Sequence, residues 1–72
     1  MSSTVVCRMA DGKVHNELCQ TKKFGVQMLS NILERHRVKG NQVTEHLVDQ
    51  QNLQYVVRDA KGSLVSTYEI VD

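Results

Sequence analysis

The sequence predicts an α+β fold in which one amphipathic helix packs on an antiparallel sheet, with the elements in the order ββαβββ. Two short β-like runs flank Asp11-Gly12, the dipeptide most typical of a tight hairpin turn. The apolar residues then follow a helical period between Thr21 and Gly40, and beyond Gly40 the period returns to two. These changes of pattern divide the chain into two strands, one helix and three strands.

The N-terminal hairpin is predicted to join residues 4–9 and 14–19 through a two-residue loop of Asp11 and Gly12. This register places three pairs on the face expected to join the core: Met9 with Val14, Cys7 with Asn16, and Val5 with Leu18. The other face is mostly polar and is expected to face solvent. It carries Thr4, Val6, Arg8, His15, Glu17 and Cys19.

Residues 21–40 are predicted to form an amphipathic helix, with Thr21 as the N-cap and Gly40 just beyond the C-terminus. Gly25 and His36 lie near the middle of its apolar arc, and a glycine there permits a close approach of the helix backbone. The arc is about 200° wide, so we expect part of it to be shared with a second subunit. Its apolar members are Phe24, Val26, Met28, Leu29, Ile32 and Leu33.

Three antiparallel strands are predicted to follow, within residues 43–48, 53–57 and 64–71. The turn before the last strand has two interpretations. Asp59 with Gly62 fits a type I turn plus a G1 bulge, whereas a two-residue Lys61-Gly62 loop pairs Tyr55 with Tyr68. The sequence leaves both open.

The length of 72 residues predicts a single domain, residues 1–72, with a thin core that buries only about 60% of the surface of the unfolded chain. Small domains gain stability from disulfides, metals or self-association, and the last of these leads us to expect a homodimer. Residues 1–6 have no basic region, and no apolar run approaches about 18 residues. We therefore expect a cytoplasmic protein with no membrane role.

No set of residues predicts catalysis, a cofactor or a bound metal. Cys7 and Cys19 are not spaced as Cys-x-x-Cys, and the predicted register places them on opposite faces, so Cys7 is expected to act as a small core residue. His15, His36 and His46 lack the base, the orienting group and the oxyanion pocket that nucleophilic catalysis needs. We expect His36 to be a core histidine that either bonds to a backbone carbonyl or borders the last helical turn. The chain is not expected to be an enzyme.

Charge is unevenly distributed although the net charge is only +1. Residues 20–40 carry a net charge of +4 and residues 41–72 a net charge of −3. Cations near a helix C-terminus offset its dipole, but lysines in the first turn oppose it, which favours an anionic partner. The five residues predicted to bind a partner are Lys22, Lys23, Arg35, Arg37 and Lys39.

The leading hypothesis is a small, non-enzymatic binding or regulatory module that acts through protein–protein contacts, at a sheet edge or at the basic helix. Open edges and a broad apolar helix face motivate it. The alternative is a nucleic-acid-binding protein, which would use the same five basic residues and bind with an affinity that falls steeply with salt.

Overall fold

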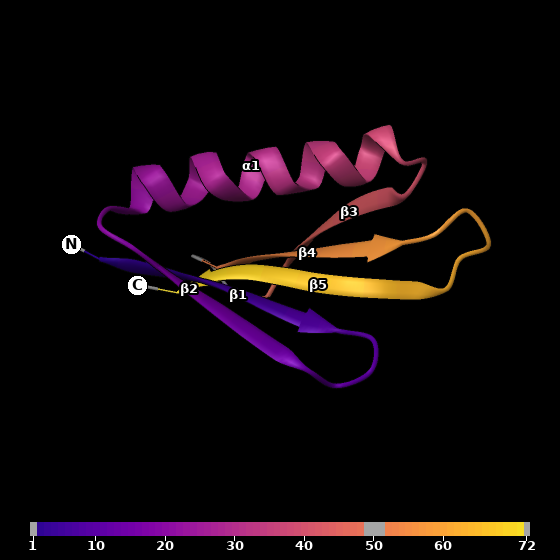
Figure 1. Cartoon of the computed structure of the whole chain (residues 1–72), viewed down its shortest axis with the longest axis horizontal. Helices are drawn as coiled ribbons and strands as arrows, with labels where there is room; N and C mark the ends of the chain where they lie inside the picture. The colour runs from indigo at the N-terminus through magenta and orange to yellow at the C-terminus, as the bar shows by residue number, and fades with distance from the viewer. Residues whose placement is uncertain (1, 49–51, 72) are drawn as a thin grey trace.

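The predicted α+β fold and the order ββαβββ are confirmed in a computed structural model, which describes residues 2–48 and 52–71 (Figure 1). One helix lies along one face of a twisted sheet and leaves the other face open. The elements are β1 (Ser3–Met9), β2 (Val14–Cys19), α1 (Lys22–Val38), β3 (Gln42–Leu47), β4 (Leu53–Arg58) and β5 (Leu64–Val71).

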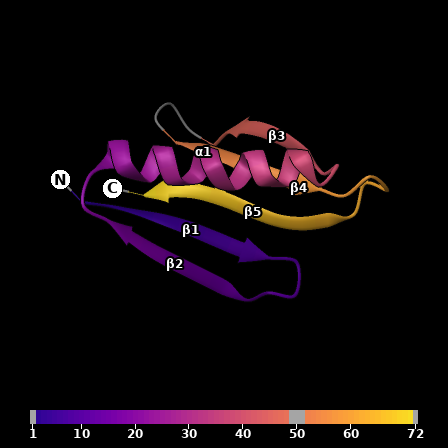
Figure 2. The same ribbon diagram turned by 45° about the horizontal axis from the view of Figure 1, so that its top comes forward.

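The five strands form a single antiparallel sheet in the order β2-β1-β5-β4-β3 (Figure 2). β1 and β5 are adjacent at its centre, where Cys7 opposes Tyr68 and Val5 opposes Ile70. β2 and β3 therefore form the two outer edges, and α1 crosses the face between them. On the open face, Arg8 and Glu69 form an ion pair that ties β1 to β5.

The helix begins and ends as the sequence predicts. Thr21 is the N-cap, and its Oγ1 accepts a hydrogen bond from Phe24 N at 3.1 Å. Gly40 adopts φ 90°, and the bonds from Asn41 N to His36 O and from Gly40 N to Arg37 O form a Schellman motif. No helix among the described residues is long and apolar enough to cross a membrane.

The register predicted for the first hairpin is wrong by one residue, because Arg8, not Met9, opposes Val14. A two-residue type I′ loop needs a positive φ at both of its residues, but Gly12 has φ 92° and Asp11 does not have a positive φ. The chain instead forms a type I turn with a G1 bulge, in which Gly12 N donates to Met9 O at 3.0 Å. A shift by one residue exchanges the two faces of β2.

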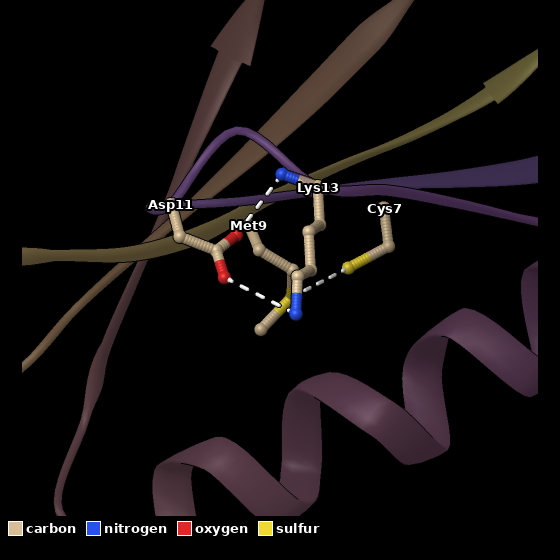
Figure 3. Close-up of polar contacts among 4 residues, drawn as sticks. All are labelled: Cys7, Met9, Asp11 and Lys13. Atoms are coloured by element: carbon tan, nitrogen blue, oxygen red, sulfur yellow. Dashed lines mark hydrogen bonds and ion pairs between the residues drawn. The ribbon is translucent and has the colours of Figure 1, made fainter.

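Asp11 and Lys13 hold this loop in shape, as Figure 3 shows. Lys13 N donates to Asp11 Oδ1 at 3.0 Å, and Lys13 Nζ lies 3.9 Å from Asp11 Oδ2. Cys7 and Met9 project from β1 toward the helix side, with Cys7 Sγ 3.5 Å from Met9 Sδ.

The last turn combines features of both sequence interpretations. Gly62 N donates to Asp59 O, and Gly62 has φ 87°, as expected for a type I turn with a G1 bulge. Tyr55 nevertheless opposes Tyr68, because the register shifts by one residue beside Arg58. Val65 is the extra residue of this second bulge, and its carbonyl accepts from Ala10 N at 3.1 Å.

The core lies between α1 and the sheet. Leu29 and Leu33 are buried against the sheet, and Met28 and Ile32 are half-buried beside them. Gly25 is buried as well, and its backbone lies close to Val5 and Cys19. The buried core residues are Val5, Cys19, Leu29, Leu33, Val57 and Tyr68.

Candidate functional site

The outer edge of β2 is an exposed stretch of backbone at one side of the sheet. In the described residues, β2 pairs with β1 on one side and with no strand on the other. Residues 14–18 are all exposed, and only Cys19 at the end of the strand is buried. The strand contains no proline. Such an edge is a template for pairing with another chain.

The turn determines which backbone groups of β2 point outward. Met9 N donates to Lys13 O at 2.8 Å, so these two residues form a hydrogen-bonded pair, and such pairs alternate along an antiparallel ladder. The residues bonded to β1 are then His15, Glu17 and Cys19. We call the residues whose N–H and C=O groups point away from β1 the outward residues, namely Val14, Asn16 and Leu18.

The side chains of β2 divide between two environments. His15 and Glu17 project to the helix side, opposite Cys7 and Val5 of β1 respectively. The outward residues project to the open face of the sheet. The edge therefore presents an imidazole and a carboxylate on one face, and Val14 and Leu18 on the other.

A groove runs along the helix side of this edge. Its volume is about 290 Å³, and it lies between β2 and the side of α1 that carries Met28 and Ile32. His15 and Glu17 line its outer wall, and Val5 and Tyr68 line its inner part. A chain placed beside β2 would contact both the backbone edge and this side of the helix.

A second hollow lies where β2 meets α1. Leu18 and Phe24 line it, and these side chains are 73% and 59% exposed. Both are large and apolar, and they lie at the same end of the edge. Together with Met28 and Ile32 they extend the apolar surface from the strand to the helix. We call this whole surface, from the outward residues to Phe24, Met28 and Ile32, the β2–α1 surface.

His36 is part of a hydrogen-bonded network between the helix and the sheet. Asn41 Nδ2 lies 3.1 Å from His36 Nδ1, and His36 Nε2 lies 2.9 Å from Tyr68 Oη. Because an amide NH₂ group only donates, Nδ1 is the acceptor, and the neutral ring donates from Nε2 to Tyr68. Of the two predictions for His36, the bond to a backbone carbonyl is wrong, because its partners are a tyrosine hydroxyl and an asparagine amide, and the position at the last helical turn is confirmed.

Burial and a neighbouring cation both favour the neutral form of His36. Burial lowers the pKa of His36 below its usual 6.5, and the positive charge of Lys39 lowers it further. Burial also raises the pKa of Tyr68 above 10, which the Cys7 thiol reinforces and the Ser66 hydroxyl opposes. Both groups are uncharged at neutral pH, as an interior hydrogen bond requires.

The two cysteines do not meet. The corrected register brings Cys7 and Cys19 to the same face, but Cys7 opposes His15 whereas Cys19 opposes Ser3, about 13 Å further along the hairpin. Cys19 Sγ lies 3.9 Å from Glu17 O. Cys19, predicted to face solvent, is a core residue.

Among the described residues, no group of three or more His, Cys, Asp or Glu side chains is placed to hold a metal ion.

The five predicted partner-binding residues lie at both ends of α1. Lys22 and Lys23 form its first turn, about 22 Å along the axis from Arg37 near its end. Arg37 contacts Glu34 at 3.5 Å. Arg35 and Arg37 are two residues apart, so their side chains diverge by about 200° around the helix. Lys39 is the C-cap, and all five side chains are exposed.

On the helix face near β3, Tyr55 and Glu45 oppose each other across the strands. Burial raises the pKa of Tyr55, as do its hydrogen bond to Glu45 and the charge of that carboxylate, whereas Arg37 lowers it. This second edge therefore carries an anion at its centre. The edge of β2 carries both a base and an acid.

In comparisons with known proteins, no family model, no protein of curated function and no solved structure matches this chain.

Proposed function

We propose that this protein is a small, non-enzymatic binding module that holds another polypeptide chain along the outer edge of β2. One observation carries the proposal: the N–H and C=O groups of Val14, Asn16 and Leu18 point outward in a row on an exposed strand. Addition of a strand to such an edge supplies main-chain hydrogen bonds for affinity and neighbouring hollows for specificity.

The residues of this edge support binding. Natural edges that must remain single are blocked by lysine, proline, a bulge or a covering loop. Between Val14 and Leu18 the strand has no lysine, proline or bulge, and Glu17 is its one formally charged residue. Its ladder with β1 is regular over all six residue pairs. The exposed Leu18 and Phe24 add apolar area beside the backbone groups.

The groove along β2 suits contact with a side chain better than it suits catalysis. Cys7 and His15 are directly opposite each other, yet the thiol is directed to Met9 Sδ at 3.5 Å. A nucleophilic thiol needs a hydrogen bond to a base.

The location of the protein is also part of the proposal. Both thiols are free, which fits a reducing compartment such as the cytoplasm.

Photo-crosslinking tests the proposal. A photoreactive amino acid replaces Leu18, the protein is expressed and irradiated in cells, and covalent adducts are identified by mass spectrometry. Ala60, exposed on the β4–β5 turn, is the control position. We expect a defined protein adduct from position 18 and not from position 60. Equal labelling at both positions, or labelling at neither, overturns the proposal.

A further inference from the structure

The β2–α1 surface fits a second copy of the same chain. Resting on the proposed function, we infer that the strand bound at the β2 edge is β2 of another molecule, antiparallel and centred on Asn16. The two sheets then continue as one across a two-fold axis. Pairing of one edge with itself is isologous, so the assembly stops at a dimer.

Backbone hydrogen bonding selects this register. Antiparallel strands exchange hydrogen bonds only where outward residues face outward residues. Centred on Asn16, the pairing sets Asn16 opposite Asn16 and Val14 opposite Leu18 of the other copy. All three outward residues of each strand then bond. A displacement by two residues in either direction leaves only two outward residues of each strand bonded.

The side chains select the same register. On the helix side, His15 of each copy opposes Glu17 of the other. Displacement by two residues sets either His15 or Glu17 opposite itself. An imidazole N–H can donate a hydrogen bond to a carboxylate across a strand pair, whereas two carboxylates directly opposite each other destabilise the pair. On the open face, Val14 of each copy covers Leu18 of the other, and Leu18 is 73% exposed in the single chain.

The helix contributes a third match. Met28 and Ile32 lie on the side of α1 that borders the groove along β2, and Phe24 lies beside Leu18. In the joined sheet, the two helices lie on one face, on either side of the two-fold axis. The apolar sides of the helices then flank the paired His15 and Glu17 residues. This accounts for the part of the apolar arc of α1 on the side of β2, whereas Val26 lies on the other side, beside Tyr55 and Ile70.

The opposite edge fits a copy of itself less well. Val48 N donates to Asn52 O at 2.9 Å, so the groups of β3 that point away from β4 belong to Val43, Glu45 and Leu47. Self-pairing over all three sets Glu45 directly opposite Glu45. Two facing carboxylates destabilise that arrangement. The charge pattern therefore assigns self-association to β2 and not to β3.

Reciprocal charge variants test the register. His15→Glu sets a new carboxylate opposite the native Glu17, and Glu17→Lys sets a new ammonium group opposite the native His15. Each variant alone is therefore expected to dimerise about tenfold more weakly than the wild type. In a mixture of the two, the new carboxylate opposes the new ammonium group, and the native Glu17 opposes the native His15. We expect the mixed dimer to recover wild-type affinity. Ala60→Glu, a charge change away from the edge, is expected to leave the affinity unchanged.

Static light scattering over a concentration series, with native mass spectrometry of the mixture, measures these affinities. Weak single variants with a recovered mixed dimer support the β2–β2 register. A dimer that neither variant weakens overturns the register. A wild-type protein that stays monomeric at every concentration overturns the inference that the partner is a second copy. The crosslinking experiment at position 18 then tests the proposed function separately. An adduct with another protein supports the proposed function, and the absence of an adduct overturns it.

Discussion

His36 Nε2 lies 2.9 Å from Tyr68 Oη, and this hydrogen bond joins the last turn of α1 to the centre of the sheet. Its geometry depends on the face of β5 that carries Tyr68 and on the Schellman motif that places Asn41 beside the same ring. The bond anchors the end of the helix that lies farther from β2.

We predict that stability falls as pH falls through the range where unfolded histidine titrates. The pKa of His36 is lowered in the folded state, so below about 6.5 the unfolded chain binds a proton that the folded chain resists. The contribution of His36 to the free energy of unfolding is fully present above pH 6.5. It is lost as the pH falls from there toward the pKa of His36 in the folded state. The groups facing the ring are Tyr68, Asn41 and Lys39.

Urea unfolding between pH 8 and pH 5 measures this dependence. His36→Gln keeps a polar side chain but removes the titration, and its stability is expected to vary less over that range. His46→Gln, at an exposed position of β3, is the matched control and is expected to retain the wild-type slope. A His36→Gln slope equal to that of the wild type would contradict the assignment.

Gly25→Ala is predicted to stabilise the protein. A Cβ atom at this position would lie 3.7 Å from Val5 Cγ2 and 3.8 Å from Cys19 Sγ, which are ordinary van der Waals distances. Alanine in a helix interior is favoured over glycine by about 0.8–1 kcal/mol. Gly25→Leu adds atoms with no room beyond that contact and is expected to destabilise the fold by about 1–3 kcal/mol. Thermal unfolding of both variants measures the difference.

Lys23→Glu is predicted to raise the free energy of unfolding by about 0.3–1 kcal/mol, because the first turn of α1 carries lysines and no acidic residue. A role in binding an anionic partner would explain why a lysine that lowers the stability of the helix stands at this position. Chemical denaturation at low salt measures the gain, and about 1 M salt is expected to reduce it. A loss of stability would show that Lys23 makes a favourable contact in the fold.

Two proline substitutions are predicted to differ sharply although they are adjacent. Asn16→Pro removes an N–H group that points away from β1, so the monomer should lose little stability while the edge is blocked. Glu17→Pro removes an N–H group that bonds to β1 and should cost about 1–3 kcal/mol. Denaturation of both variants at low concentration compares them, and equal costs would refute the assigned direction of the outward residues.

The sequence predicts the element order and both helix ends because Thr21, Gly40 and the change of period are local signals. It does not predict the register of the first hairpin, because glycine at position 12 suits two turns that differ by one residue. The pairing of Tyr55 with Tyr68 depends on a bulge at Val65. That bulge depends on contacts between distant parts of the chain, including Ala10.

The same difference of one residue decides how much of the candidate site the sequence predicts. An open strand edge and a shared helix face are expected from the pattern, and both enter the proposed surface. The two-residue loop would leave Val14, Asn16 and Leu18 as the outward residues, but it would turn His15 and Glu17 to the open face, so their position beside the helix requires the observed register. The φ of Asp11 and the hydrogen bond from Gly12 N to Met9 O distinguish these turns.

Residue-resolved amide hydrogen exchange of β2, measured over a range of protein concentrations, tests the central claim most directly. The amides of His15, Glu17 and Cys19 bond to β1 and should be protected at every concentration. We predict that the amides of Val14, Asn16 and Leu18 become protected together as the protein concentration rises, with the same midpoint concentration for all three. Rapid exchange of these three amides at all concentrations, beside protected neighbours, would contradict the pairing of two β2 edges.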